Sequence, residues 1–577
     1  MNNKPILLLL ILVILPLCSA SEGSMKLLAA SGLETNLTGS TADLRLEMVP
    51  GTGRVFIETF PITKLDTQIS TRFAQEVACD FLGADCSRYN FFYTIKSKSS
   101  IIGGPSASSA IAVLTAAMLQ GQEVNSSIAM TGTINSGGLI GPVGGLRAKL
   151  EAAAKENITT VLIPRGERNV TENNKTTDLV EYGKGLGLNV IEVARLSEAM
   201  SYFTGKSYEV PAVNITINQM YNDTMGYISQ LLCNKSRLLM ASVGKLSIPA
   251  NSTQLREALN LTERAENASS QNKFYSAASY CYGANVRLRY LLLKARNMTI
   301  AEIVTMTARM KASIYESNNN LDLLNINTIN DLQAAMVVRD RLTESKENLD
   351  DVAKAMKQNN TDAAISSLAN GIERLNSAAS WSNFFNKGGR TFEIDQNSLM
   401  ESCRSKVSEA SERIEYIRML TGLPLDNTQK QLDYAYDDYD NGRYELCLFK
   451  ASLAKAEADI LISLFGVSTN STKDIMELKL GLARDNINKQ ASKGIFPILS
   501  YSYYEYAESL KDTDISSALL YVEYALELSN QEIYFKKADE KRLVVDNRVL
   551  LAASFAAGLL IGGSATLLLR NASRKGK

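Results

Sequence analysis

The chain has no histidine among its 577 residues, and this absence excludes several kinds of catalytic site. A Ser-His-Asp triad, a Cys-His pair and a histidine-ligated metal are all impossible. A serine that acts as a nucleophile would therefore need another base, and lysine is the known alternative. The formal net charge is zero at pH 7, so there is no electrostatic reason to expect nucleic acid as a partner.

The sequence also lacks a Gly-x-x-x-x-Gly-Lys-Ser/Thr phosphate-binding loop, and no cofactor is expected. The acidic run Asp437–Asp440 invites a calcium interpretation. It does not meet the ligand spacing of an EF-hand loop, so we expect a turn between helices there and no metal site.

The candidate nucleophile is Ser106, which follows the turn-forming residues Gly103, Gly104 and Pro105. The run from Ser106 to Leu119 is rich in alanine and other small apolar residues, which predicts a buried helix. Ser106 would then lie at or near a helix N-terminus. Unpaired N–H groups and the positive end of the helix dipole favour a developing oxyanion at such a place.

The candidate base is Lys149, which lies 43 residues after Ser106 in a predicted helix from about Leu146 to Glu156. Between them, Ser127–Gly132 is typical of a short buried strand. A lysine buried beside apolar strands has its charged form disfavoured, so it can act as a neutral base.

At these residues the sequence resembles the proteolytic domain of the Lon protease family, over the run from Thr59 to Gly205. The matching pieces, in order and with matching spacing between the serine and the lysine, are Leu65–Gln68, Gly104–Ala107, Ala129–Gly132, Gly141–Lys149 and Thr160–Pro164. The resemblance implies Ser106 as nucleophile, Lys149 as general base and Thr131 as a supporting residue that helps to hold the lysine. With the two predicted membrane-targeting segments described below, the chain is similar to membrane-anchored, archaeal-type Lon-like serine proteases.

The same resemblance implies an endopeptidase that acts on polypeptide, and a homo-oligomer, because Lon-like domains tend to form rings. Lon enzymes of the usual kind couple cleavage to an ATPase module, and no such module is recognised here. We therefore expect ATP-independent cleavage of unfolded or extended polypeptide. Backbone N–H groups near Ser106 and in the Gly137–Gly138 turn are candidate oxyanion donors.

One departure from the family pattern is Gly103, because Lon proteins often carry an acidic residue just before the Gly-Pro-Ser motif. An alternative is therefore a weak or inactive surface scaffold or binding protein built on a Lon-like domain. A third hypothesis is a protein that cleaves only itself.

Both ends of the chain carry apolar segments. Residues 1–20 combine a lysine, a leucine- and isoleucine-rich run and small residues at the end, which predicts a secretory signal peptide, or otherwise an uncleaved anchor. Residues 549–569 are 21 residues without a charge, which predicts a single transmembrane helix. The basic tail at 570–577 predicts a cytoplasmic C-terminus, with the bulk of the chain extracytoplasmic in the cell membrane.

Two further features agree with an exported chain. Without Cys18 of the predicted signal, six cysteines remain, and an even set in an exported protein suggests disulfides. Fifteen Asn-x-Ser/Thr sequons make glycosylation plausible.

The fold class that we predict is an α/β (α+β) Lon-type proteolytic domain, then an all-α region of helical hairpins, then the transmembrane helix. The proteolytic domain would span residues 25–205, a linker 206–224 and the helical region 225–540. The helical region contains two related three-helix modules, at about 230–295 and 400–465, each with a cysteine in its first and third helix.

The disulfide candidates follow from this organisation, although connectivity cannot be deduced from sequence alone. A local Cys79–Cys86 bridge and the pairs Cys233–Cys281 and Cys403–Cys447 are predicted. Tyrosines crowd the runs 434–444 and 501–506, either as an aromatic groove for extended peptide or as packing between helices, and we favour packing.

Overall fold

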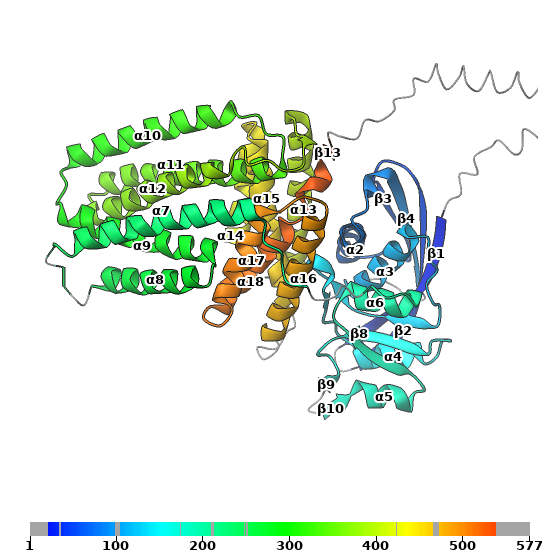
Figure 1. The fold of residues 1–577 in the computed structure, drawn as a ribbon. Coiled ribbons are helices and arrows are strands. Elements are labelled where there is room, and N and C mark those ends of the chain that lie inside the picture. The colour runs from blue at the N-terminus through cyan, green and yellow to red at the C-terminus, as the bar shows by residue number, and fades with distance from the viewer. Residues whose placement is uncertain are drawn as a thin grey trace, which may run out of the picture.

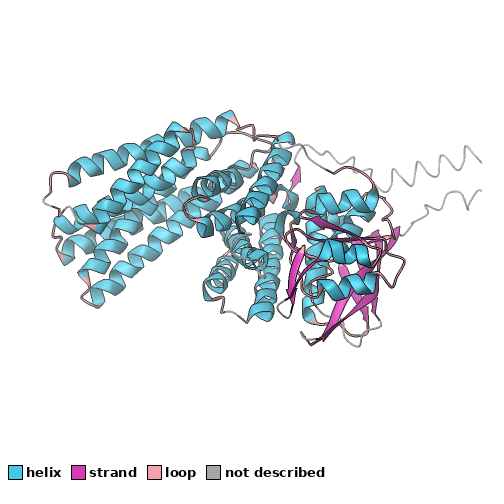
Figure 2. Ribbon diagram, turned by 90° about the horizontal axis from the view of Figure 1, so that it is seen from below, coloured by secondary structure: helices cyan, strands magenta, loops and turns pink. Residues whose placement is uncertain are grey.

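The computed structural model describes residues 21–537, apart from 34–35, 98–103, 173–174, 209–212, 247, 250–251, 423 and 465–471. Figure 1 shows the N-terminal part, in blue and cyan, beside a larger helical part that contains the rest of the described chain. Most of the strands gather in the N-terminal part, as Figure 2 shows in magenta, and one short pair lies in the helical part.

A seven-stranded mixed sheet forms the framework of the N-terminal domain. Its order is β11-β8-β5-β1-β2-β4-β3. The long hairpin of β1 and β2 and the β2–β4 pair are antiparallel, whereas the other neighbours run parallel. The strands are β1 (Ser21–Leu33), β2 (Asn36–Pro50), β3 (Val55–Phe60), β4 (Tyr89–Ser97), β5 (Ile128–Met130), β8 (Thr160–Pro164) and β11 (Asn189–Val193).

Helices cover both faces of this sheet, because its inner strands alternate apolar side chains between two cores. In β5, Ile128 and Met130 pack with α2 (Leu65–Leu82), α3 (Ser108–Leu119) and α6 (Leu196–Thr204). Ala129 points to the other core, with α4 (Leu146–Ala153) and α5 (Leu179–Gly185). The element that carries Ser106 and the helix that carries Lys149 therefore come from opposite faces of the sheet.

Shorter elements complete the domain. β6 (Thr133–Ile134) and β7 (Ile140–Gly141) form a small hairpin that encloses the 3₁₀ turn η2 (Ser136–Gly138). β9 (Asn169–Glu172) and β10 (Lys175–Asp178) form a second hairpin.

The helical region begins at α7 and consists mainly of antiparallel neighbours joined by short turns (Figure 1). Its helices are α7 (Gln219–Val243), α8 (Thr253–Ser270), α9 (Phe274–Ala295), α10 (Ile300–Asp322), α11 (Ile329–Lys357), α12 (Thr361–Trp381), α13 (Gln396–Thr421), α14 (Asp426–Asp440), α15 (Tyr444–Leu464), α16 (Thr472–Ser492), α17 (Ile498–Leu510) and α18 (Ile515–Glu527). A short pair of strands, β12 (Phe392–Glu393) and β13 (Lys536–Lys537), ties the chain after α18 to the start of α13.

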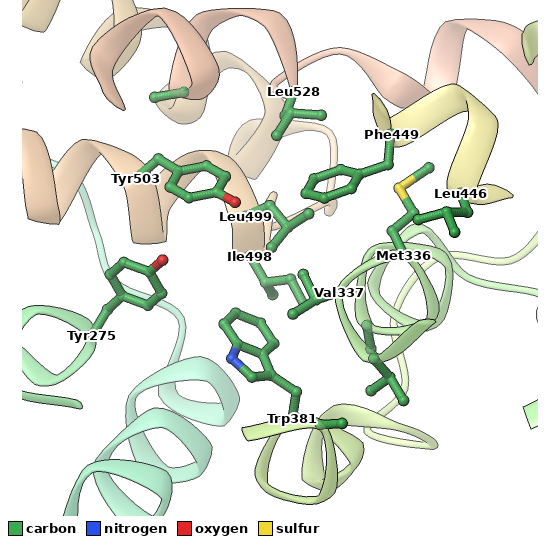
Figure 3. Close-up of a cluster of buried hydrophobic side chains, with 14 of the residues drawn as sticks. Tyr275, Met336, Val337, Trp381, Leu446, Phe449, Ile498, Leu499, Tyr503 and Leu528 are labelled. Carbon is green, nitrogen blue, oxygen red and sulfur yellow. The ribbon is translucent and has the colours of Figure 1, made fainter. Parts of the chain in front are cut away.

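One continuous apolar core joins the helices into a single body. Figure 3 shows Trp381 of α12 and Phe449 of α15 converging with Ile498 of α17, together with residues of α9 and α11. The tyrosines predicted to pack between helices include Tyr503, which is 6% exposed and lies against Tyr275 of α9. Burial of such rings, together with the many aliphatic side chains of the same core, favours helix association.

The described residues contain three disulfide bonds, and these join the pairs that the sequence predicts. Cys79 at the end of α2 pairs with Cys86. Cys233 of α7 pairs with Cys281 of α9, and Cys403 of α13 pairs with Cys447 of α15. Each of the two long bridges thus links the first helix of a three-helix module to its third.

The predicted transmembrane helix requires a correction to the fold class and to the location in a cell membrane. In residues 21–537, as far as the structure describes them, no helix is both long and apolar enough to cross a membrane. The physical reason is that the long helices repeat charged residues along their length, as α11 does with Arg339, Arg341 and Lys354. The predicted signal at 1–20, the span at 549–569 and the tail at 570–577 lie outside the described residues.

Candidate active site

Ser106 lies in the turn that precedes α3, two residues before the helix begins at Ser108. Gly104 has φ 94°, a left-handed conformation that favours glycine, and the Thr67 hydroxyl donates to its carbonyl over 3.4 Å. The Ser108 hydroxyl donates to the Pro105 carbonyl and accepts from the backbone of Ile134. These bonds fix the turn and leave the Ser106 side chain half-buried at its surface. Gly103, where the family often has an acid, lies outside the described residues.

Lys149 lies on α4 and is 3% exposed. Burial lowers the pKa of its ammonium from 10.5 to about 7, because the charged form loses its hydration. Among the described residues no carboxylate pairs with Lys149 to stabilise its charge. A buried lysine of this kind exists partly as the neutral amine near neutral pH, which is the form that can accept a proton.

Thr131 connects the two candidate catalytic residues. Its hydroxyl accepts a hydrogen bond from the Lys149 Nζ at 3.0 Å and donates one to the Ser106 carbonyl at 3.2 Å. The Gly132 N–H donates to the same carbonyl at 3.0 Å. Thr131 is 1% exposed, so this short chain of hydrogen bonds is shielded from water.

The Ser106 hydroxyl itself makes no hydrogen bond to Lys149 within the described part of the chain. The hydrogen bond between a nucleophile and its base is often long without substrate and shortens when substrate binds. The geometry is therefore compatible with proton transfer. The arrangement brings together Ser106, Lys149 and Thr131, the three site residues that the sequence predicts.

The two sets of predicted oxyanion donors differ in position. The N–H groups of Ser106 and Ala107 have no backbone acceptor among the described residues, and both lie at the start of α3, where donors are left unpaired. The Gly138 N–H instead donates to the Asn135 carbonyl, and Gly137 packs against Leu482 and Leu526 of the helical region. The Gly137–Gly138 turn therefore faces α16 and α18.

Sequence reasoning missed one contact of this turn. The Ser136 hydroxyl donates to the Glu523 carboxylate of α18 at 2.6 Å, and Glu523 is 1% exposed. A serine in a Gly-rich turn carries no sequence signal for a partner 387 residues away.

A family model matches the part of the chain that carries this site. Residues 99–202 match the family model of the Lon protease C-terminal proteolytic domain. The Lon protease of Buchnera aphidicola is 39% identical over 98 residues, which cover 17% of this chain and 12% of that protein. The Lon protease of Lachnoclostridium phytofermentans is 26% identical over 174 residues, 29% of this chain and 20% of that protein.

The chain is also similar to an archaeal Lon protease. The archaeal Lon protease of Methanothermobacter thermautotrophicus is 34% identical over 102 residues, 18% of this chain and 16% of that protein. The chain thus spans a fifth or less of the length of these curated relatives. These matches support a Lon-like protease family and a protease function, and the family-model match ends at residue 202, before the helical region.

Proposed function

We propose that this chain, which contains a Lon-like proteolytic domain, is a serine endopeptidase with Ser106 as nucleophile and Lys149 as general base. The observation that carries the proposal is the burial of Lys149 without a counter-ion, with the Thr131 hydroxyl between it and the backbone of Ser106. A lysine in this setting has little structural purpose, because burying an unpaired ammonium destabilises the fold.

In the acylation step, neutral Lys149 accepts the proton of the Ser106 hydroxyl as Oγ attacks the substrate carbonyl carbon. The resulting oxyanion is stabilised by N–H groups at the start of α3. Lys149, now an ammonium, then gives its proton to the leaving amine, and the peptide bond breaks to leave an ester on Ser106. In deacylation the neutral lysine removes a proton from water as the water oxygen attacks the ester carbonyl carbon. The lysine ammonium then returns this proton to Ser106 Oγ as the ester C–O bond breaks, and the acid product loses its own proton to solvent.

Thr131 orients the base in this mechanism. Its hydroxyl oxygen accepts from the lysine, while its hydrogen is committed to the Ser106 carbonyl. The amine is therefore held at one edge of the site with its lone pair available for the serine proton.

We further propose that the substrate is unfolded or extended polypeptide and that cleavage does not need ATP, since the sequence has no phosphate-binding loop. A folded substrate would have to expose an extended segment before Ser106 could reach a peptide bond.

A second candidate function is a weak or inactive scaffold. The missing hydrogen bond between Ser106 and Lys149 in the described structure is the observation in its favour.

The test compares the full chain as wild type, Ser106→Ala and Lys149→Ala, incubated with a labelled unfolded protein across pH 6–9 without nucleotide. Lys155→Ala is the matched control, because Lys155 follows α4 and is exposed. We expect cleavage by the wild type and the control only, and no stimulation by added ATP. Equal cleavage by all four proteins would refute the assignment, and no cleavage by any of them, when all are folded, would support the scaffold.

A further inference from the structure

The hairpin of β6 and β7 joins two parts of the candidate active site. It begins directly after Thr131 and Gly132, which hold the Ser106 carbonyl, and ends at Gly141, five residues before α4. Any movement of this hairpin therefore acts on both Thr131 and the helix that carries Lys149.

The tip of the hairpin lies against the helical region, where Ser136 and Gly138 are buried and Gly137 between them is exposed. The Ser136 hydroxyl donates to one oxygen of Glu523 at 2.6 Å. Gly137 has φ 67°, and a Cβ there would come within 3.1 Å of Leu526 and 3.4 Å of Leu482. The tip is thus tied to α18 by a hydrogen bond, and Leu526 and Leu482 leave little room for a side chain at position 137.

Glu523 is held from its other side within the helical region. Its second carboxylate oxygen forms an ion pair with Lys479, which is 0% exposed, and accepts from the Ser463 hydroxyl at 3.5 Å. A buried carboxylate anchored by an ammonium has little freedom to move, and breaking such a pair is costly. Glu523 therefore presents a fixed acceptor to Ser136.

A second contact fixes the base of the hairpin. Leu139 pairs with Arg195 through their backbones, and the Ile140 N–H donates to the Ala194 carbonyl at 2.8 Å. The Arg195 guanidinium forms an ion pair with Asp485 of α16 at 3.2 Å. Gly481 of α16 leaves room for that guanidinium, because a Cβ there would collide with it. The helical region thus holds the hairpin at two points.

We propose that Glu523 is a positioning residue for the candidate active site: by fixing Ser136 it holds the β6–β7 hairpin, and with it Thr131 and Lys149, in the arrangement needed for cleavage. The inference rests on the proposed protease function and gives the helical region a role in it. Glu523 touches no reacting atom, since it acts through Ser136 and the hairpin.

The central variant is Glu523→Gln in the full chain, which keeps the side-chain volume and removes the charge that pairs with Lys479. Ser136→Ala removes only the hydroxyl of the turn. Glu373→Gln is the matched control, because Glu373 is also fully buried and paired, with Lys235 at 2.7 Å and Arg289 at 3.0 Å, and these three residues lie on α12, α7 and α9 of the helical region.

We expect Glu523→Gln and Ser136→Ala to lower kcat by about tenfold to a hundredfold, the scale of a small misplacement of catalytic groups, with little change in KM. The acid limb of the pH profile should also move to higher pH, because a looser hairpin lets water reach Lys149 and raises its pKa from about 7. In the double variant Glu523→Gln/Ser136→Ala, kcat should fall by a smaller factor than the product of the two single-variant factors, because both substitutions act through one contact.

Amide hydrogen exchange gives a readout that does not depend on cleavage. In the Ser106→Ala background, Glu523→Gln should speed exchange at residues 133–141, whereas Glu373→Gln should not. If the wild type shows no Ser106-dependent cleavage, the proposed function fails. Hydrogen exchange still tests whether Glu523 fixes the β6–β7 hairpin. The inference would be overturned if hydrogen exchange at 133–141 were unchanged in folded Glu523→Gln. It would also be overturned if Glu523→Gln and Glu373→Gln lost kcat equally and the acid limb of the pH profile did not shift.

Discussion

Lys149 donates a hydrogen bond to the Thr131 hydroxyl over 3.0 Å, and this neutral group is the only side chain paired with it in the part of the chain that the structure describes. A neutral partner gives the ammonium orientation without the charge compensation that a carboxylate would supply. The pairing therefore leaves the lysine near the point of losing its proton at neutral pH.

The first prediction concerns the pH dependence of cleavage. Burial lowers the Lys149 pKa to about 7, and the base is active only when deprotonated. The value of kcat/KM should therefore be small at pH 6, rise through about pH 7 and level off above it. A series of initial rates from pH 5.5 to 9 measures this limb. A rate that is low at pH 8 and still rises steeply at pH 9 would instead show that Lys149 keeps a pKa well above 7.

A second prediction tests the role of Thr131. Thr131→Val keeps the branched shape but removes the hydroxyl that accepts from Lys149 and donates to Ser106. We expect kcat to fall by about tenfold to a hundredfold, and the free energy of unfolding to fall by about 1–3 kcal/mol because a buried ammonium loses its partner. Rates and thermal unfolding measure the two effects. Thr159→Val is the control, because Thr159 is an exposed threonine with a weaker bond to the Ser127 carbonyl; an equal effect of both variants would contradict the assigned role.

A third prediction concerns the long disulfides. The bridge between Cys403 and Cys447 closes a separation of 44 residues, for which the chain-entropy model gives about 4 kcal/mol of stabilisation. The bridge between Cys79 and Cys86 closes only 7 residues and corresponds to about 2 kcal/mol. The double variant Cys403→Ala/Cys447→Ala should therefore lower the midpoint of denaturant unfolding more than Cys79→Ala/Cys86→Ala. The opposite order would show that the entropy of the unfolded chain does not dominate here.

The position of the candidate nucleophile Ser106 follows from a local sequence pattern, whereas its pairing with Lys149, 43 residues away, is a prediction from the resemblance to the Lon proteolytic domain. The glycines and proline before Ser106 indicate an exposed turn, and the small residues that follow indicate a buried helix, which the structure contains as α3. The disulfide pairs were predictable for a similar reason, since the repeated three-helix pattern brings each cysteine of α7 and α13 beside its partner.

Two features of the fold were not predicted. The hairpin of β1 and β2 was missed, although apolar and charged residues alternate from Leu44 to Met48 and the apolar ones are buried. The docking of Ser136 on Glu523 had no such signal, because it depends on how two regions far apart in the sequence pack. The transmembrane expectation rested on an apolar run at 549–569, outside the residues that the structure describes.

The last prediction concerns Glu505 of α17, which is 6% exposed and has no ion pair within the described residues. The backbone N–H and the hydroxyl of Ser276 donate to its carboxylate at 2.9 and 3.1 Å, and these bonds favour the charged form. Burial outweighs them and raises the Glu505 pKa from 4.5 to about 7. The neutral acid is therefore the form that the fold prefers.

This shift has a definite sign for stability. Because the folded pKa lies above the unfolded one, the contribution of Glu505 is fully present below about pH 4.5 and is lost as pH rises to about 7. Glu505→Gln should remove that loss of stability. The Tm of the variant minus that of the wild type should therefore be larger at pH 8 than at pH 5. Glu508→Gln, on the same helix and partly exposed, is the control and should leave the pH dependence of Tm unchanged. If Glu505→Gln and the wild type lose Tm in parallel between pH 5 and pH 8, Glu505 is ionised in the folded protein throughout that range and burial does not dominate its titration.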